Sequence, residues 1–380
     1  MKKLCIVVSS PFTLEVFLVP HLRTLCRLYD VTVIVNTQNR DLLKTLGVGG
    51  KLHPVAIERK IMPLRDICSL VKLFFTFLLK RFDLVHSITP KAGLLSMSAA
   101  FLARTPVRIH TFTGQVWGTQ SGMRRWLLKT ADKVTAFFAS DILVDSASQR
   151  DFIIQQNVLS RKKASVLANG SISGVDANRF RPDRGLWIKV REAHGIPLNS
   201  FVILYMSRLT RDKGAIVMAE AFGVYAVENR ASHLIVVGPD EESLRPQMRA
   251  LCHSCVDRLH FVDLVHVPEE YMACADVFCL PSYREGFGTA LINAAAAGIP
   301  AIASRIYGSS DAVEDGGTGF LFEAGNVDAF VGLLRRLADH PELRTAMGQR
   351  ARERVIKEFS EELLTSSLLA FYRARLDVRN

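Results

Sequence analysis

Residues 277–300 read VFCLPSYREGFGTALINAAAAGIP, and this stretch decides the fold. The apolar run Val277–Leu280 is typical of a buried strand, a glycine-containing loop follows it, and an alanine-rich helical segment comes next. Small alanine side chains let a helix pack closely on a sheet. Glycine lets backbone N–H groups approach an anion without a Cβ in the way. The stretch therefore predicts a strand, loop and helix unit whose loop can bind phosphate or sugar.

The same alternation extends over the second half of the chain. Five apolar runs there are expected to be strands: Val202–Met206, His233–Val237, His260–Val262, Val277–Leu280 and Pro300–Ala303. Helical segments such as Gly214–Val227 and Ser243–Cys252 separate them. Continuous apolar strands alternating with helices indicate a parallel sheet covered on both faces. From about Val327 onward the pattern is wholly helical, and it ends in the amphipathic segment Glu361–Leu376.

The first half repeats this pattern. Its expected strands are Leu4–Ser9, Val31–Val35, Leu84–His86, Val107–Phe112 and Ile142–Val144, and its expected helices include Leu14–Tyr29, Leu94–Leu102 and Met123–Phe138. Turn formers cluster at residues 169–185. We therefore predict an α/β fold of two Rossmann-like, doubly wound domains facing a central cleft, over residues 1–175 and 176–360. The helix of about 361–380 is expected to pack back on the first domain. The cleft is then the natural ligand site.

Composition narrows the class of protein. A chain of 380 residues with 49% hydrophobic content is not a small disulfide-stapled scaffold, and 22% charged residues without low complexity argues against disorder. The 7 cysteines are odd in number and scattered through apolar segments, which favours reduced thiols in the cytoplasm. Cys252 and Cys255 have no second pair at zinc-finger spacing, so we interpret them as buried or edge thiols.

The positive charge is unevenly distributed. The net charge is +11, with 24 Lys or Arg against 10 Asp or Glu in residues 1–175, and 24 against 27 in residues 176–380. Such asymmetry points to a polyanionic partner, namely nucleic acid, an anionic membrane or a phosphate-bearing substrate. No nucleic-acid module is recognisable, so we expect no nucleic-acid partner.

The segment Leu64–Phe82 contains the most hydrophobic window, Leu70–Leu79, which Lys72 interrupts and Lys80-Arg81 closes. It is too short for the ~18–20 apolar residues of a membrane span. Two interpretations stay open: a crossover helix buried against the sheet, or a helix whose apolar face enters a bilayer with its basic residues at the headgroups. The N-terminal apolar run Leu4–Val8 is likewise too short for a signal peptide and is expected to be a first strand.

Two cations follow the strand Val202–Met206. Arg208 is expected just past its carboxyl end and Lys213 at the start of the next helix, where ligands bind in open α/β sheets. A guanidinium and an ammonium facing one point would bind a diphosphate and neutralise charge that grows on it as a leaving group. Two solvated loop charges are the alternative. Glu285 lies in the glycine loop, where a carboxylate would accept hydrogen bonds from sugar hydroxyls.

Taken together, these motifs resemble glycosyltransferase family 4, retaining enzymes of the GT-B fold. The resemblance is carried by Asn169-Gly170, Val175-Asp176, Phe180, Ser207-Arg208, Lys213-Gly214, Val237-Gly238-Pro239, Ala275-Asp276-Val277, Pro281-Ser282, Glu285-Gly286-Phe287-Gly288, Asp315-Gly316 and Thr318-Gly319. His86–Leu94 and His110–Gly114 are similar to the branch that extends lipid-linked glycans for bacterial O-antigen, capsule or related surface polysaccharides.

The resemblance implies a role for each site residue. Arg208, Lys213 and Glu285 would be catalytic, and the donor would also contact Gly286, Phe287, Gly288, Thr289 and Asn293. Ser10, Lys91, Thr113 and Gly114 are candidates for the acceptor side or the cleft. No metal and no cofactor is implied, because the two cations take over charge neutralisation.

The implied reaction is retaining transfer of a sugar, an N-acetylhexosamine from a UDP-sugar, to a polyprenyl-diphosphate-linked glycan. The enzyme would then be cytoplasmic and peripheral on the inner face of the bacterial membrane, with an anionic membrane surface as partner. A GDP-sugar donor and a sugar-nucleotide epimerase of the same architecture are the alternatives. Two positions depart from the family: Asn293 stands where a second glutamate is usual, and Thr113 where a histidine is frequent. His110 is no simple substitute for that histidine, because three residues along a strand place it on the opposite face, and we interpret it as a packed or capping histidine.

Overall fold

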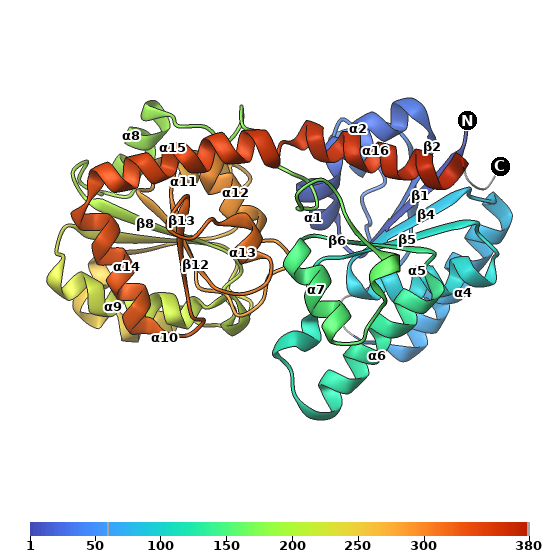
Figure 1. The fold of residues 1–380 in the computed structure, drawn as a ribbon, viewed down its shortest axis with the longest axis horizontal. Coiled ribbons are helices and arrows are strands. Elements are labelled where there is room, and N and C mark those ends of the chain that lie inside the picture. Colours follow the sequence, from blue (N-terminus) through green and yellow to red (C-terminus); the bar gives the residue numbers. More distant parts are fainter. Residues whose placement is uncertain (59–60, 378–380) are drawn as a thin grey trace. The chain divides into compact units, whose positions relative to one another are not determined.

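The computed structural model describes residues 1–58 and 61–377, and the chain divides into two compact units (Figure 1). The first unit contains residues 1–173 together with the C-terminal helix α16 (Glu361–Asp377), and the second contains residues 174–360. Both units are parallel α/β sheets covered by helices, in agreement with the predicted pair of Rossmann-like domains.

The first unit has seven strands among the described residues, all parallel, in the order β3-β2-β1-β4-β5-β6-β7. They are β1 (Lys3–Val8), β2 (Asp30–Val35), β3 (Lys51–Pro54), β4 (Leu84–Ile88), β5 (Val107–Phe112), β6 (Asp141–Val144) and β7 (Ala164–Val166). The edge strands β3 and β7 are absent from the sequence prediction. Both are short and only partly buried, so they lack the apolar run that marks a central strand.

Helices cover both faces of this sheet. One core contains residues of α4 (Pro63–Lys80), α5 (Pro90–Leu102), α6 (Gly122–Phe138) and α7 (Ala147–Gln155). The opposite core contains residues of α2 (Val19–Leu28), α3 (Leu42–Thr45) and α16. The helix predicted as Leu14–Tyr29 begins earlier, with α1 (Pro11–Thr13), and passes through a π-helical segment at Leu14–Leu18 before α2.

Helix α16 packs against α2, and buried histidines connect it to the unit. Nδ1 of His21 lies 2.8 Å from Oγ1 of Thr365, and Nδ1 of His86 lies 2.5 Å from the hydroxyl of Tyr372. Burial lowers the pKa of His86 to about 3, so this imidazole is neutral at pH 7. The C-terminal helix is therefore part of the first unit's core.

The second unit has six parallel strands in its described part, in the order β10-β9-β8-β11-β12-β13. They are β8 (Phe201–Met206), β9 (Ser232–Val237), β10 (Leu259–Val262), β11 (Val277–Leu280), β12 (Ala301–Ser304) and β13 (Gly319–Phe322). The helices are α8 (Arg184–Ala193), α9 (Ala215–Glu228), α10 (Arg245–Leu251), α11 (Pro268–Cys274), α12 (Thr289–Ala296), α13 (Ser309–Ala312), α14 (Val327–Asp339) and α15 (Pro341–Glu358). Strand β13 is missing from the prediction because its four residues follow a glycine-rich turn without a longer apolar run.

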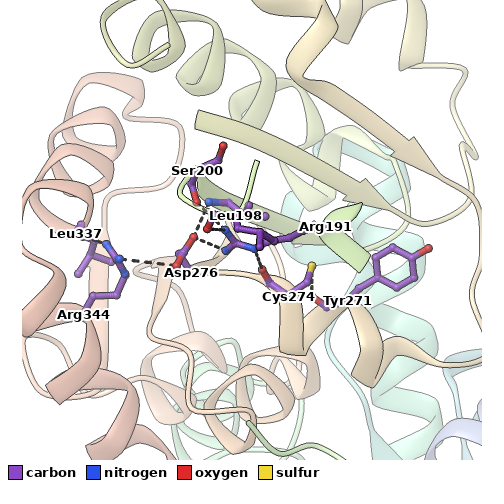
Figure 2. Close-up of polar contacts among 9 residues, drawn as sticks. Arg191, Leu198, Ser200, Tyr271, Cys274, Asp276, Leu337 and Arg344 are labelled. Atoms are coloured by element: carbon purple, nitrogen blue, oxygen red, sulfur yellow. Dashed lines mark hydrogen bonds and ion pairs between the residues drawn. The ribbon is translucent and has the colours of Figure 1, made fainter. Parts of the chain in front are cut away.

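A buried arginine holds the amino ends of β8 and β11 together (Figure 2). The side chain of Arg191 is 1% exposed, and its guanidinium donates to the carbonyl of Ser200 at 2.8 Å and to Oδ2 of Asp276 at 2.8 Å. The same carboxylate oxygen accepts from the N–H of Val202 at 2.7 Å. Removing one partner of such a pair leaves an uncompensated charge, which costs about 3–5 kcal/mol. This network fixes α8 to the sheet at the end opposite the loops that follow the carboxyl ends of the strands.

Two minor interpretations are confirmed. Cys252 and Cys255 are both buried free thiols. His110 is fully buried, with Nδ1 2.9 Å from Oγ of Ser87, and a Cβ at Gly93 would stand 2.3 Å from its ring. Glycine at position 93 is thus what lets α5 lie against this histidine.

Candidate active site

The predicted donor residues lie where the strand order of the second sheet reverses. The chain builds outward from β8 to β9 and β10, and then returns to β11 on the other side of β8. The loops after β8 and β11 therefore leave neighbouring strands at the same edge of the sheet, which is the usual place for a ligand in an open α/β sheet. Arg208 and Lys213 are on the first loop, and Glu285 to Gly288 are on the second.

Lys213 and Glu285 contact each other directly. Nζ of Lys213 is 2.7 Å from Oε1 of Glu285, and the two side chains are 15% and 10% exposed. The hydroxyl of Ser282 donates to the same carboxylate oxygen at 2.8 Å. Nζ of Lys213 also donates to the carbonyl of Arg284 at 3.5 Å, so the ammonium is fixed in direction and one of its three N–H donors is left for an anion. The structure thus brings together the predicted phosphate-binding lysine and the predicted sugar-binding glutamate.

The Tyr205 side chain contacts the main chain of both predicted cations, Arg208 and Lys213. Its buried hydroxyl lies 3.1 Å from the carbonyl of Lys213 and 3.3 Å from that of Arg208, and these two carbonyls share its one proton as acceptors. Burial raises the pKa of this hydroxyl, and the Glu285 carboxylate adds to the rise, so Tyr205 stays a protonated donor. Gly214 lets the loop after β8 lie against the loop after β11. Its φ is +73°, and a Cβ there would be 1.9 Å from the carbonyl oxygen of Pro281.

Arg208 is paired with an acid from a third loop. Its Nη1 is 2.7 Å from Oε2 of Glu241, in the loop after β9, and both side chains are about one third exposed (34% and 35%). The loops are in close contact, since the N–H of Leu209 donates to the carbonyl of Pro239 at 2.9 Å. Arg208 is therefore at the same edge as Lys213, with its guanidinium drawn toward Glu241.

The glycine loop presents its backbone rather than its largest side chain. Phe287 is 2% exposed and packs on Phe359 in the core, which leaves only its main chain for a ligand. Gly288 has a φ of +83° and immediately precedes α12. Thr289 and Asn293 are one turn apart and half-buried on this helix. Gly286 is buried beside them in the loop.

The residues predicted for the acceptor side follow three neighbouring strands of the first unit. Ser10 comes after β1, Lys91 after β4, and Thr113 and Gly114 after β5. Ser10 caps α1 by accepting from the N–H of Thr13 at 3.2 Å, and Nζ of Lys91 is 2.6 Å from Oδ1 of Asp66. Both side chains therefore already have local partners, and the four predicted residues lie at one edge of the sheet.

The sequence prediction missed three residues whose side chains contact Lys213, Arg208 or Glu285: Tyr205, Glu241 and Ser282. Ser282 could have been found, because it stands in the loop with Glu285. Finding Glu241 requires the knowledge that β9 lies beside β8, and Tyr205 is hidden in a continuous apolar strand.

No group of three or more His, Cys, Asp or Glu side chains that could hold a metal ion occurs in residues 1–58 and 61–377.

Comparisons with known proteins agree with this geometry. The description "Glycosyl transferases group 1" matches residues 188–354, and "Glycosyl transferase 4-like domain" matches residues 18–170. A Staphylococcus aureus protein, "Capsular polysaccharide biosynthesis glycosyltransferase CapM", is 31% identical over 85% of both chains. An Escherichia coli relative, "UDP-Gal:alpha-D-GlcNAc-diphosphoundecaprenol alpha-1,3-galactosyltransferase", is 27% identical over 80% of this chain and 78% of its own.

Among solved structures, Anabaena Alr3699/HepE in complex with UDP and glucose superposes with a TM-score of 0.82. It covers 98% of this chain and 100% of its own at 18% identity, which supports the fold.

Two parallel α/β units of this topology, together with the family matches, define a glycosyltransferase of the GT-B type. The chain belongs to the group 1 glycosyltransferases, family GT4, and it is an enzyme that transfers hexosyl groups. Within the part of the chain that the structure covers, no helix is long and apolar enough to cross a membrane.

Proposed function

We propose that this enzyme transfers an N-acetylhexosamine from a UDP-sugar, with retention of anomeric configuration, to a polyprenyl-diphosphate-linked glycan in bacterial surface polysaccharide synthesis. The observation that carries the proposal is the Lys213 ammonium fixed 2.7 Å from Glu285 at the switch point. That position combines a cation for the donor diphosphate with an acceptor for sugar hydroxyls.

Each side chain has a distinct task in this reaction. Lys213 and Arg208 bind the diphosphate and stabilise the negative charge that develops as the glycosyl bond breaks. Glu285 accepts a hydrogen bond from the sugar and orients it. The acceptor hydroxyl oxygen bonds to the anomeric carbon on the face from which the diphosphate departs, and its proton passes to a leaving phosphate oxygen. Neither a metal nor a cofactor is needed in this scheme, since the two cations supply the neutralising charge.

The relatives support the choice of donor base and acceptor class. The Escherichia coli relative is named for a UDP-sugar donor and a diphosphoundecaprenol-linked acceptor, the Staphylococcus aureus relative for capsular polysaccharide, and the Anabaena structure contains UDP. We extend the UDP donor and the lipid-linked acceptor to this chain. UDP-galactose and GDP-sugars are the competing donors.

The first unit is proposed to bind the acceptor. Its excess of basic residues suits a glycan diphosphate and an anionic membrane surface. We do not propose a nucleic-acid partner, because the sequence contains no recognisable nucleic-acid-binding module. Ser10, Lys91, Thr113 and Gly114 surround the edge where the acceptor hydroxyl would arrive. The enzyme would then work on the cytoplasmic face of the bacterial membrane, without spanning it.

A donor panel tests the proposal. The protein is incubated with UDP-N-acetylglucosamine, UDP-N-acetylgalactosamine, UDP-galactose and GDP-mannose, with and without a short-chain polyprenyl-diphosphate glycan, and the products are analysed by mass spectrometry and NMR. We expect acceptor-dependent release of UDP and an anomeric configuration equal to that of the donor. Conversion of the donor to an isomer without acceptor would instead identify an epimerase, and an inverted product would refute retention.

A further inference from the structure

Helix α4 has two apolar faces, and only one is used by the fold. Leu73 and Phe77 are fully buried in the core of the first unit. On the outward face, six large apolar side chains are between 45% and 82% exposed: Leu64, Ile67, Val71, Phe75, Leu78 and Leu79. The crossover interpretation of this segment is thus correct for the inner face, and it leaves the outer face unexplained.

The exposed side chains form one continuous stripe. Successive members from Leu64 to Leu78 are separated by three or four residues, the spacing that places side chains on the same side of a helix. The helix has 18 residues and is therefore about 27 Å long at 1.5 Å per residue. A soluble protein rarely exposes an apolar strip of this length without a partner.

Basic residues border the stripe. Lys72 lies along it, and Lys80 and Arg81 close its C-terminal end, whereas Arg65 is paired with Glu58 at 2.5 Å. The one acid in α4, Asp66, has its Oδ1 2.6 Å from Nζ of Lys91, so its charge is compensated. Over residues 63–138, which include helices α4, α5 and α6, the sequence has eleven Lys or Arg against three Asp.

We propose that this outer face of α4 is a docking surface for an anionic lipid bilayer. The helix lies in the plane of the membrane, with the stripe from Leu64 to Leu79 at the boundary of headgroups and acyl chains and the cations at the lipid phosphates. An apolar stripe bordered by lysine and arginine on a helix too short and too charged to span is the pattern of an interfacial helix. A second copy of the chain fits less well, because two surfaces of the same positive sign repel each other.

The docking proposal extends the proposed function, which requires a membrane-linked acceptor but does not say which surface meets the membrane. Cys68 makes a direct probe possible, since it is exposed on α4 whereas Cys26 is half-buried and the other five cysteines are buried. An environment-sensitive fluorophore on Cys68 should shift its emission to shorter wavelength with phosphatidylglycerol vesicles at low salt. It should shift little with phosphatidylcholine vesicles or in 0.5 M NaCl.

Side-chain variants provide the second readout. The triple variant Ile67→Ser, Phe75→Ser, Leu79→Ser changes only exposed positions, and we expect at least a tenfold fall in partition onto phosphatidylglycerol vesicles measured by co-sedimentation. The matched control Val224→Ser, Val227→Ser, Ile356→Ser removes three apolar side chains of similar exposure from the second unit, and we expect its partition to be unchanged.

The outcomes separate docking from catalysis. The triple variant should keep the wild-type rate on a water-soluble acceptor, since no residue of the stripe belongs to the donor or acceptor edge. Unchanged vesicle partition of the triple variant, or an unshifted Cys68 probe, would overturn the docking proposal. So would a wild-type dimer in analytical ultracentrifugation that the triple variant abolishes. Loss of transfer with every donor, together with intact vesicle binding, would overturn the proposed function and leave the docking surface standing.

Discussion

Replacing Lys213 with methionine removes one charge of a largely buried pair and keeps most of the side-chain volume. Two separate losses follow from the geometry. The leaving diphosphate loses a fixed cation, which by analogy with a single electrostatic donor lowers kcat about 10²–10³-fold. The carboxylate of Glu285, only 10% exposed, loses its partner at 2.7 Å and keeps the hydroxyl of Ser282. Because the site is partly open, we expect the free energy of unfolding to fall by about 1–3 kcal/mol.

The double variant Lys213→Met, Glu285→Gln separates these losses. Glutamine is neutral and still accepts from Ser282, so the double variant should regain most of the stability while its kcat remains at or below that of the single variant. Stability is measured by urea unfolding, and kcat by the rate of nucleotide release at saturating donor and acceptor. The reasoning would be refuted by a Lys213→Met enzyme with the wild-type kcat, or by a double variant in which activity returns together with stability.

Three further predictions follow from contacts elsewhere in the chain. Glu241→Gln releases Arg208 from an ion pair that is about one third exposed, so UDP should bind up to about fivefold more tightly by calorimetry, and weaker binding would show that Glu241 orients the arginine instead. Burial lowers the pKa of His86 to about 3 from an unfolded value of 6.5, so stability is fully present above pH 6.5 and is lost as the pH falls toward 3, by about 1.4 kcal/mol per pH unit from this group. Urea unfolding at pH 7 and pH 5 measures this loss, and His86→Asn should reduce it; an equal slope in both proteins would contradict the assignment. Arg191→Met should cost about 3 kcal/mol, because Asp276 loses its partner at 2.8 Å and keeps only the N–H of Val202 and the more distant guanidinium of Arg344 at 3.8 Å; a change below 1 kcal/mol would contradict the role of the network.

The central strands, and the loop residues that follow them, were predictable because their signals are local. Val277–Leu280 is a continuous apolar run, and the loop from Pro281 to Gly288 separates it from an alanine-rich helix. Parallel topology then requires the ends of neighbouring strands to meet, which brings Lys213 to Glu285. Edge strands such as β3 pair on one side only and are half exposed, so their composition does not distinguish them from loops.

The contact between the loops after β8 and β9 was not predictable. The pairing of Arg208 with Glu241 depends on the order of β8 and β9 in the sheet, and on Gly238, where a Cβ would stand 2.0 Å from the carbonyl oxygen of Ser207. The outer stripe of α4 is visible in the sequence as hydrophobic residues. Only the structure separates it from the residues that the core uses.

The position of the donor diphosphate decides whether Lys213 and Arg208 act as proposed. A crystal structure of the enzyme with a bound, non-hydrolysable UDP-sugar tests it directly. We predict diphosphate oxygens within hydrogen-bond distance of Nζ of Lys213 and of the guanidinium of Arg208, and a hydroxyl of the sugar on the carboxylate of Glu285. A diphosphate bound away from both cations, or held by another edge of the sheet, would contradict the central claim.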